Sequence, residues 1–467
     1  MSVLTMKFGG SAVGTTTALT QVVSIMLQAS EHWDHLIVVA SALEGVTDAL
    51  VEAVHLAHLS NRRGYRRIVA RIRTRHLALI EQLPLNVGER SSLQADIDRL
   101  LFDMLDVCQA LSDAAVEDTI APRTMDAIIS VGERLSVRII AALLRNSGLR
   151  SVALDTIGIV ITDAQFGSAT PELDATRLRY EQYVPPLLER NIIPVLSGFI
   201  GSTPDGRVTT LGRGGSDYTA AIIATCSYSD EMWMWADVDG MMSADPHELP
   251  DARIIPELSY EEIAEMAYFG ARIVQTRMIG LVQEQSIPVR IKNVYKPQHA
   301  GTLVTGKVRP LAKIKAVTSI QGVALHANHG GSLAGVYSVL DAIVKAATGF
   351  PANVTITAQS SSARFVCVVI PPSAGPDAVG AAEAAFNQEI DVGRLELRGW
   401  SVMPVTVITV IGAALMNRPE VAAQIFDAMK DIPILAVSQG PSSCNLSLVV
   451  DPENAFSSLE RIHALIV

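Results

Sequence analysis

The chain has 467 residues, with 37 lysines and arginines against 48 acidic residues, so its formal net charge is −11. Hydrophobic residues make up 49% of the sequence, which excludes a disordered or fibrous protein, and the length predicts two to four domains with ample core. The negative charge argues against nucleic-acid binding, and no apolar run is long enough to span a bilayer, so neither nucleic acid nor membrane is an expected partner. We therefore expect a pocket that binds a small ligand.

The cysteines indicate a reducing compartment. Cys108, Cys226, Cys367 and Cys444 form neither a CxxC pair nor a zinc-like spacing with histidine. We expect four reduced, structural thiols in a cytoplasmic protein. The segment before Lys7 is too short for a signal peptide.

The chain opens with a strand-helix-strand pattern. The expected elements are a strand over Val3–Phe8, a helix over Thr15–Ser30 and a strand over Leu36–Ala40. Such a unit predicts a parallel sheet with a right-handed crossover.

A helical subdomain is expected from Glu44 to about Ala115. Apolar residues recur there at spacings of three and four, with breaks expected at Gly64 and around Pro84–Gly88. Seven arginines crowd one stretch of it: Arg62, Arg63, Arg66, Arg67, Arg71, Arg73 and Arg75. Because aromatic residues are almost absent among them, a solvated face that pairs with neighbouring acids is favoured over nucleic-acid binding.

Strands and helices then alternate. The expected strands are Ser151–Leu154, Ile157–Thr162, Ile193–Phe199 and Met232–Ala236, and the expected helices are Gly132–Asn146, Thr176–Glu189 and Asp217–Thr225. This alternation predicts an α/β sandwich.

Beyond Pro310 the pattern changes to two similar modules in tandem, which suggests a regulatory tail. The first has strands at Lys313–Leu325, Asn353–Thr357 and Arg364–Ile370 around a helix at Gly335–Ala347. The second has strands at Val402–Val410, Ile434–Ser438 and Cys444–Val450, with helices at Pro419–Lys430 and Pro452–Leu465.

Two glycine-rich loops follow expected strands. The first, Lys7–Ser11, can offer glycine amides and a lysine ammonium to a phosphate, although it is neither a P-loop nor a dinucleotide fingerprint, and an ordinary turn is the alternative. The second, Leu211–Asp217, joins three glycines to Arg213, whose guanidinium can bind a carboxylate or phosphate through two hydrogen bonds. A ligand-binding loop is favoured there over a simple helix cap.

Three further segments carry candidate ligand groups. Ser41 and Thr47 lie just past the second strand, at the edge where open α/β sheets bind ligands, with helix capping as the alternative. The loop Trp235–Pro246 places acids past another strand, which suits nucleotide or magnesium contacts or a plain Asp-Gly turn. Glu133 opens a helix, where an acid can simply complement the helix dipole.

Together these segments resemble the aspartokinase branch of the amino-acid kinase family, over essentially the whole chain. The likeness is carried by Lys7–Gly10, Ser41–Thr47, Gly132–Ser136, Gly198–Gly201, Arg213–Tyr218, Trp235–Pro246, Met266–Arg272 and Val289–Leu303. The C-terminal modules resemble a tandem pair of ACT domains, with Ser438–Asn445 in the second.

The resemblance implies an α/β fold, a three-layer sandwich with a mainly parallel sheet, followed by two α+β modules of the βαββαβ, ferredoxin-like type. The kinase domain is expected over residues 1–305, with its helical subdomain at about 44–115. The ACT domains are expected over 313–395 and 400–467.

The activity implied is MgATP-dependent phosphorylation of the L-aspartate side-chain carboxylate to 4-phospho-L-aspartate, the first step towards lysine, threonine and methionine. Phosphoryl transfer needs charge neutralisation and positioning, and Mg²⁺ is expected to arrive with ATP rather than on assigned protein ligands. Because no dinucleotide-binding domain follows Val467, a monofunctional kinase is expected. The alternatives are a related kinase with another carboxylate acceptor and a catalytically weak ACT-type amino-acid sensor.

The resemblance also assigns residues to roles. Lys7 is expected to stabilise the transferring phosphoryl group, Asp217 to orient Lys7 or a magnesium-bound phosphate, and Arg272 to replace a phosphate-binding lysine. The residues assigned to aspartate are Ser41, Thr47, Glu133, Arg213, Gly214, Gly215 and Ser216. Arg213 would bind the α-carboxylate and Glu133 the α-ammonium. The residues assigned to ATP are Lys7, Gly9, Gly10, Ser11, Ala236, Asp237, Met242, His247 and Arg272.

Some of these positions depart from the family pattern. Ser11-Ala12 replaces Thr-Ser, Met242 replaces a tyrosine and His247 an arginine, so altered nucleotide affinity is expected. An amino-acid effector is expected between the ACT domains of two subunits, in a homodimer or a dimer of dimers, coupling Gly330–Val336 to the active site. Because Asn353–Ile356 holds no carboxylate for a lysine ammonium, threonine or no effector is favoured over lysine.

Overall fold

A computed structural model describes residues 1–114, 119–270, 274–306, 314–327, 336–349, 353–360, 363–371, 374–375, 377–391, 400–413, 415, 418–440 and 442–466. It divides into two compact units, Met1–Met241 with Val274–Gly306, and Met242–Ile273 with Lys307–Val467. The boundaries expected for the kinase and ACT domains stay a prediction. By compactness alone, the segment Met242–Ile273 groups with the C-terminal part of the chain.

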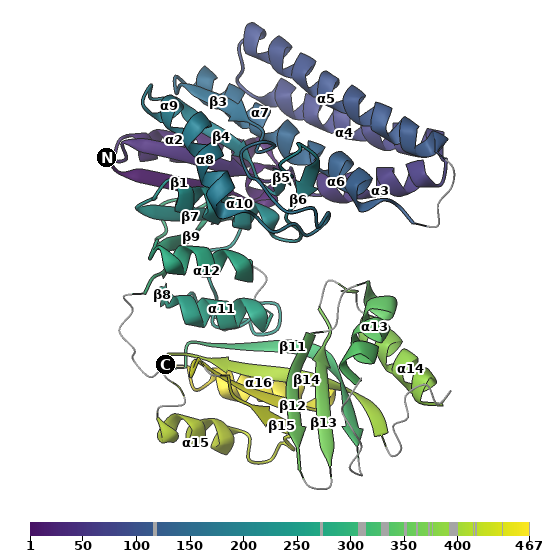
Figure 1. Cartoon of the computed structure of the whole chain (residues 1–467). Coiled ribbons are helices and arrows are strands. Elements are labelled where there is room, and N and C mark those ends of the chain that lie inside the picture. The colour runs from purple at the N-terminus through teal and green to yellow at the C-terminus, as the bar shows by residue number, and fades with distance from the viewer. Residues whose placement is uncertain are drawn as a thin grey trace. The chain divides into compact units, whose positions relative to one another are not determined.

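The first unit is built on a mainly parallel sheet in the order β3-β4-β2-β1-β7-β9-β10 (Figure 1). Its strands are β1 (Val3–Phe8), β2 (His35–Ala40), β3 (Ser151–Leu154), β4 (Ile193–Ser197), β7 (Glu231–Ala236), β9 (Val289–Asn293) and β10 (Thr302–Val304). All pairs from β3 to β9 are parallel, and only β10 runs antiparallel to its neighbour β9. Apolar residues dominate the central strands, with exceptions such as Thr5 and Lys7 of β1, because helices cover both faces of a parallel sheet. The predicted α/β sandwich is confirmed.

Helices form the outer layers of this unit. The helices α2 (Thr16–Ser30) and α7 (Val131–Asn146) pack on one face, while α10 (Gly215–Cys226) packs on the other, against α8 (Leu173–Tyr183) and α12 (Thr276–Glu284). The alternation of side chains along β1 explains what each face receives. Met6 and Phe8 join the core under α2 and α7. Lys7 points to the opposite side, where α10 begins.

The predicted helical subdomain is confirmed. It consists of α3 (Val46–His58), α4 (Arg62–Gln82) and α5 (Val87–Asp113), which pack together at one end of the sheet (Figure 1). The arginine-rich face of α4 pairs with acids on its neighbours: Arg73 lies 2.6 Å from Asp98, and Arg71 lies 3.1 Å from Glu52. The interpretation as a solvated face that pairs with neighbouring acids is therefore supported.

The expected helix break at Gly64 is wrong. Gly64 lies in the first turn of α4, where its N–H donates to the Asn61 side chain at 2.9 Å. The helix begins there because Asn61 caps it, so the break lies before the glycine.

Two further expectations from the alternation pattern need correction. Ile157–Thr162 is not a strand: the chain turns at Gly158, with a φ of 83°, and only isolated bridges follow. The helix expected over Thr176–Glu189 is interrupted between α8 and α9 (Pro185–Leu188) because proline cannot donate the backbone hydrogen bond of a continuing helix.

Shorter elements complete the first unit. They are α1 (Gly10–Val13), α6 (Pro122–Ile129), β5 (Ile200–Ser202) and β6 (Val208–Thr210). The strands β5 and β6 form an antiparallel hairpin that leads into the second glycine-rich loop.

The second unit contains an antiparallel sheet in the order β12-β13-β11-β14-β16-β15. The first repeat is β11 (Ala316–Ala327), α13 (Val336–Thr348), β12 (Asn353–Gln359), β13 (Arg364–Val369) and α14 (Ala378–Asp391). The second is β14 (Trp400–Ile411), α15 (Pro419–Ala428), β15 (Ala436–Ser438), β16 (Asn445–Val450) and α16 (Ala455–His463). The leading strands β11 and β14 pair along their full length, so the repeated order of elements confirms two similar modules.

The remainder of the second unit comes from before the repeats. The segment Met242–Ile273 contributes β8 (Glu257–Leu258) and α11 (Tyr260–Tyr268). Most of the expected effector segment Gly330–Val336 lies outside the described residues.

The predicted thiols are confirmed, since all four cysteines are buried and none forms a disulfide. Among the residues that the structure describes, no helix combines the length and the apolarity needed to cross a membrane.

Candidate active site

The parallel register brings several predicted site segments to one edge of the sheet. Phe8 of β1 lies level with Ala40 of β2 and Trp235 of β7, so the chain leaves all three strands at the same height. The residues at this edge are therefore Gly9, Ser41, Ala236 and Asp237. In open α/β sheets, ligands bind at this carboxyl edge.

Lys7 and Asp217 form an ion pair just below that edge. The Lys7 Nζ lies 2.6 Å from Asp217 Oδ1, and the two side chains are only 13% and 11% exposed. Lys7 comes from β1 and Asp217 from the first turn of α10, so the pair joins the sheet to that helix. This is the contact that the sequence analysis assigned to the phosphoryl site.

Gly9 and Gly10 leave space beside this pair. A Cβ on Gly9 would lie 3.3 Å from Lys7 Nζ, and a Cβ on Gly10 would lie 3.0 Å from the Ala42 carbonyl oxygen. The Gly9 N–H donates to the Trp235 carbonyl at 3.0 Å, so the loop is fixed to β7. Glycine at both positions lets backbone and ligand approach closely where any side chain would intrude.

Glu133 projects from the first turn of α7 into the same region. Its Oε1 accepts a hydrogen bond from the Ala42 N–H at 3.2 Å, while its Oε2 is buried without a hydrogen-bond partner. Burial raises the pKa of the Glu133 carboxyl to about 8. A buried carboxyl group with one unpaired oxygen can bind a cationic or hydrogen-bond-donating group.

Ser41 and Thr47 border the loop that Glu133 contacts. Both are half-buried, and the Glu44 N–H donates to the Gly10 carbonyl at 3.3 Å, which ties this loop to the first glycine-rich turn. Gly45, with a φ of 73°, precedes α3, and Thr47 lies in the first turn of that helix.

The second glycine-rich loop leads into α10. Gly214 adopts a left-handed conformation with a φ of 69°, and the helix starts at Gly215. Ser216 and Asp217 are buried in its first turn, while Arg213 and Gly214 are exposed. The loop thus presents a guanidinium at the surface beside buried polar groups.

Gly198 explains why Ser216 can lie where it does. A Cβ on Gly198 would come within 2.6 Å of the Ser216 Cβ, so the strand end and the helix start meet only because position 198 has no side chain. The next residue, Phe199, has a φ of 69°, a strained value for a bulky residue.

The remaining ATP-site candidates are only partly placed. Ser11 is half-buried in α1, Ala236 ends β7, and Asp237 is exposed immediately beyond it. Met242 and His247 belong to the second compact unit, so they are not placed relative to Lys7. Arg272 lies outside the described residues.

Two residues that hold the Arg213 loop escaped the sequence analysis. Arg277 of α12 donates to the Leu211 carbonyl, and its guanidinium lies 4.8 Å from the centre of the Tyr218 ring. Asp126 of α6 accepts hydrogen bonds from Thr210, which directly precedes the loop. Neither residue stands in a sequence pattern that marks a ligand site, because each is distant in sequence from the loop that it contacts.

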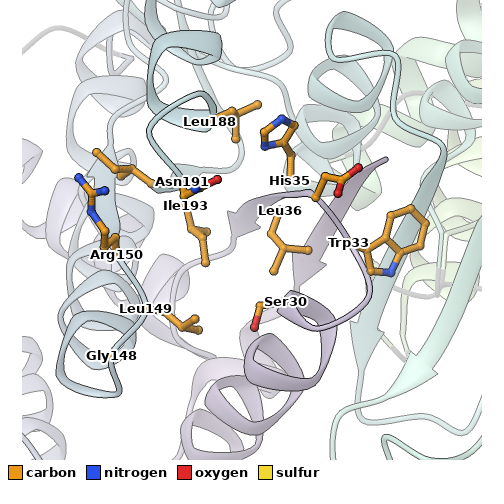
Figure 2. Close-up of a pocket in the computed structure, with 12 residues that line it drawn as sticks. Ser30, Trp33, His35, Leu36, Gly148, Leu149, Arg150, Leu188, Asn191 and Ile193 are labelled. Atoms are coloured by element: carbon orange, nitrogen blue, oxygen red, sulfur yellow. The ribbon is translucent and has the colours of Figure 1, made fainter. Parts of the chain in front are cut away.

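A separate hollow lies at the opposite edge of the sheet. Its volume is about 290 Å³, and residues at the amino ends of β2 and β4 and before β3 line it, among them Trp33, His35, Arg150 and Asn191 (Figure 2). None of the candidate site residues borders it, so the hollow does not contribute to the site described here.

Comparisons with known proteins agree with the fold. Residues 3–293 match the Amino acid kinase family, and residues 408–465 match an ACT domain. The chain is 30% identical to a chloroplastic bifunctional aspartokinase/homoserine dehydrogenase of Arabidopsis thaliana over 98% of its own length, and it spans about half of that relative (50%).

Two further relatives are matched over nearly their whole length. The aspartokinase of Schizosaccharomyces pombe is 28% identical, with 98% of this chain and 91% of that protein covered. E. coli aspartokinase III, in its crystal structure with aspartate and ADP, is 26% identical and superposes with a TM-score of 0.78. The superposition covers 99% of this chain and 99% of that chain.

Proposed function

We propose, on the premise that this chain belongs to the amino acid kinase family, that it is an aspartate kinase. The reaction transfers the γ-phosphoryl group of ATP to the side-chain carboxylate of L-aspartate: a carboxylate oxygen attacks phosphorus, the β–γ bridging P–O bond breaks, and ADP leaves. The S. pombe relative and E. coli aspartokinase III, both matched over at least nine tenths of their length, support this acceptor.

The observation that carries the proposal is a continuous set of contacts across the carboxyl edge of the sheet. Lys7 pairs with Asp217 and lies beside Gly9, Gly10 lies against the Ala42 carbonyl, and Ala42 donates to Glu133. A cation and a glycine turn suited to phosphate are thus joined through one loop to a carboxyl group with a free acceptor.

The aspartate end of the site follows from charge. An α-amino acid offers an ammonium and a carboxylate, and the proposed partners are the unpaired Glu133 Oε2 for the ammonium and Arg213 for the α-carboxylate. Ser41, Thr47 and the amides of Gly214, Gly215 and Ser216 would complete the hydrogen bonds. Glu133 must ionise to bind the ammonium, so the ligand lowers the pKa that burial has raised.

The phosphate end fits ATP. Gly9 and Gly10 form a turn that a Cβ would fill, and Lys7 supplies a positive charge next to it. Lys7, held in place by Asp217, is proposed to stabilise the phosphoryl group during its transfer. Mg²⁺ is proposed to enter with the ATP phosphates, where it neutralises charge, and Asp217 beside Lys7 offers a carboxylate oxygen of the kind that Mg²⁺ prefers.

Regulation is the second part of the proposal. The ACT match at residues 408–465 and the repeated β-α-β-β-α order favour a kinase domain over residues 1–305 followed by two ACT domains, over 313–395 and 400–467. We place an amino-acid effector, threonine or lysine, at the ACT domains of a homodimer or a dimer of dimers. Light scattering with and without each amino acid tests the assembly.

The activity is tested by ADP formation with a panel of acceptors. L-Aspartate, L-glutamate, N-acetyl-L-aspartate and D-aspartate are compared at saturating MgATP. Turnover with L-aspartate, and none with the N-acetylated compound whose ammonium is absent, is expected. If N-acetyl-L-aspartate is turned over as fast as L-aspartate, Glu133 does not bind the α-ammonium of the acceptor.

A further inference from the structure

Asp126 is a buried carboxyl group that the proposed chemistry does not use. It lies on α6 and is fully buried, and its three hydrogen-bond donors are all neutral. Asp126 Oδ1 accepts from the Thr210 hydroxyl at 2.7 Å. Asp126 Oδ2 accepts from the backbone N–H groups of Thr210 at 3.0 Å and Gly167 at 2.8 Å.

These partners lie on both sides of the loop that carries Arg213. Thr210 ends β6 and directly precedes that loop. Gly167 belongs to the neighbouring turn, whose carbonyl oxygen would lie 3.3 Å from a Cβ on Gly212. Asp126 therefore fixes the two segments that enclose Gly212, the residue next to Arg213.

Asp126 is also linked to Glu133 along the chain. The helix α6 ends at Ile129, and Ser130 alone separates it from α7, so Asp126 and Glu133 lie on two helices that follow one another directly. A change in the position of Asp126 relative to Thr210 thus alters the spacing between the Arg213 loop and Glu133.

We propose that Asp126 is a positioning residue that sets the spacing between Arg213 and Glu133, and thereby the affinity for the α-amino acid end of the acceptor. This inference rests on the proposed function, since it assigns these two residues to the α-carboxylate and the α-ammonium. Asp126 touches neither substrate, and its effect is transmitted through the backbone of Thr210 and Gly167.

The hydrogen-bond pattern predicts which substitution preserves this role. An asparagine can place its carbonyl oxygen where Oδ2 accepts from two N–H groups and direct its amide at the Thr210 hydroxyl oxygen, which can accept it. An alanine leaves the buried N–H and hydroxyl of Thr210 without this partner, and it also removes the acceptor of the Gly167 N–H. Burial also raises the pKa of the Asp126 carboxyl, which agrees with a role that depends on geometry rather than on charge.

The test compares steady-state kinetics of the full chain and three variants. Asp126→Ala is expected to raise the KM for L-aspartate by roughly 10- to 100-fold, because small misplacements of binding groups are costly, and to leave the KM for ATP within about twofold. Asp126→Asn is expected to remain within about threefold of the wild type in both constants.

Glu231→Ala is the matched control. Glu231 is a partly buried carboxylate on β7 that pairs with Arg290 at 2.8 Å, at the sheet edge opposite the site. Its loss should lower stability without changing the KM for L-aspartate. If Asp126→Ala does not fold, Thr210→Val replaces it, since valine removes only the hydroxyl, and a smaller rise in the same KM is expected.

Amide hydrogen exchange provides a readout that does not need activity. Asp126→Ala should accelerate exchange in peptides covering residues 163–168 and 208–217, whereas Asp126→Asn and Glu231→Ala should not. A wild type without aspartate-dependent turnover would overturn the proposed function, and exchange alone would then decide whether Asp126 fixes the loop. An active wild type with an unchanged KM for L-aspartate in folded Asp126→Ala would overturn the inference.

Discussion

Replacing Glu133 with glutamine gives the sharpest test of the buried carboxyl group. The ordinary pKa of a glutamate is 4.5, and burial raises that of Glu133 to about 8. Between these two values the folded protein holds a proton that the unfolded chain has released. Stability must then fall as pH rises through this window, and Glu133 makes its full contribution only below the unfolded pKa.

The size of the effect follows from proton linkage. Each pH unit inside the window costs up to about 1.4 kcal/mol, so from pH 5.5 to pH 7.5 the wild type should lose on the order of 2–3 kcal/mol through Glu133. Glutamine cannot ionise and lacks this slope. Its own buried amide has a different hydrogen-bond cost, but that cost is the same at both pH values and cancels from the comparison.

Chemical denaturation followed by tryptophan fluorescence measures this difference. Three of the four tryptophans, Trp33, Trp233 and Trp235, lie in the unit that contains Glu133, so their emission reports its unfolding. The stability of Glu133→Gln relative to wild type should improve by roughly 2–3 kcal/mol between pH 5.5 and pH 7.5. A difference between the two proteins that does not change with pH would refute the buried, neutral carboxyl group.

Further predictions address the two ends of the site and its packing. The wild-type KM for L-aspartate should fall about tenfold per pH unit as pH rises from 6 towards 8, because the ammonium needs ionised Glu133; a flat profile would contradict this pairing. Lys7→Met should lower kcat by roughly 10²- to 10³-fold, since a charge aimed at the phosphoryl group is lost, with a change of only a few fold in the KM for L-aspartate; an unchanged kcat would remove Lys7 from the mechanism. Gly198→Ala should cost about 1–3 kcal/mol of stability in denaturant melts, because its Cβ would lie 2.6 Å from that of Ser216, whereas Gly380→Ala, where the structure leaves open space, should be tolerated.

The sequence predicted the elements whose pattern is local. The strands Val3–Phe8 and Ser151–Leu154 were predicted with the bounds that the structure shows, because short, largely apolar runs between turn residues are typical of strands. Ile157–Thr162 has the same β-branched composition, yet it turns at Gly158, because the buried Thr156 bonds to Ser197 and Ile200 instead of starting a ladder. Tertiary contacts of this kind leave no periodic trace in the sequence.

In the candidate site, too, residues with a local sequence pattern could be predicted and residues placed by tertiary contacts could not. Lys7, Gly9 and the Arg213 loop could be predicted because glycines and cations after strands mark the carboxyl edge of a sheet. The Lys7–Asp217 pair was expected from the family resemblance, and the structure brings the two side chains to 2.6 Å. Asp126 and Arg277 could not be predicted, because both act on backbone groups of a loop that is distant in sequence.

The central claim, phosphorylation of the aspartate side chain, is tested most directly by trapping the product. Acyl phosphates react with hydroxylamine, so the enzyme is incubated with MgATP, L-aspartate and hydroxylamine, and the hydroxamate is identified by mass spectrometry against α- and β-hydroxamate standards. Aspartate β-hydroxamate is expected in an amount equal to the ADP formed, and Lys7→Met is expected to form it roughly 10²- to 10³-fold more slowly. ADP formation with no hydroxamate, or with the α-isomer, would contradict it.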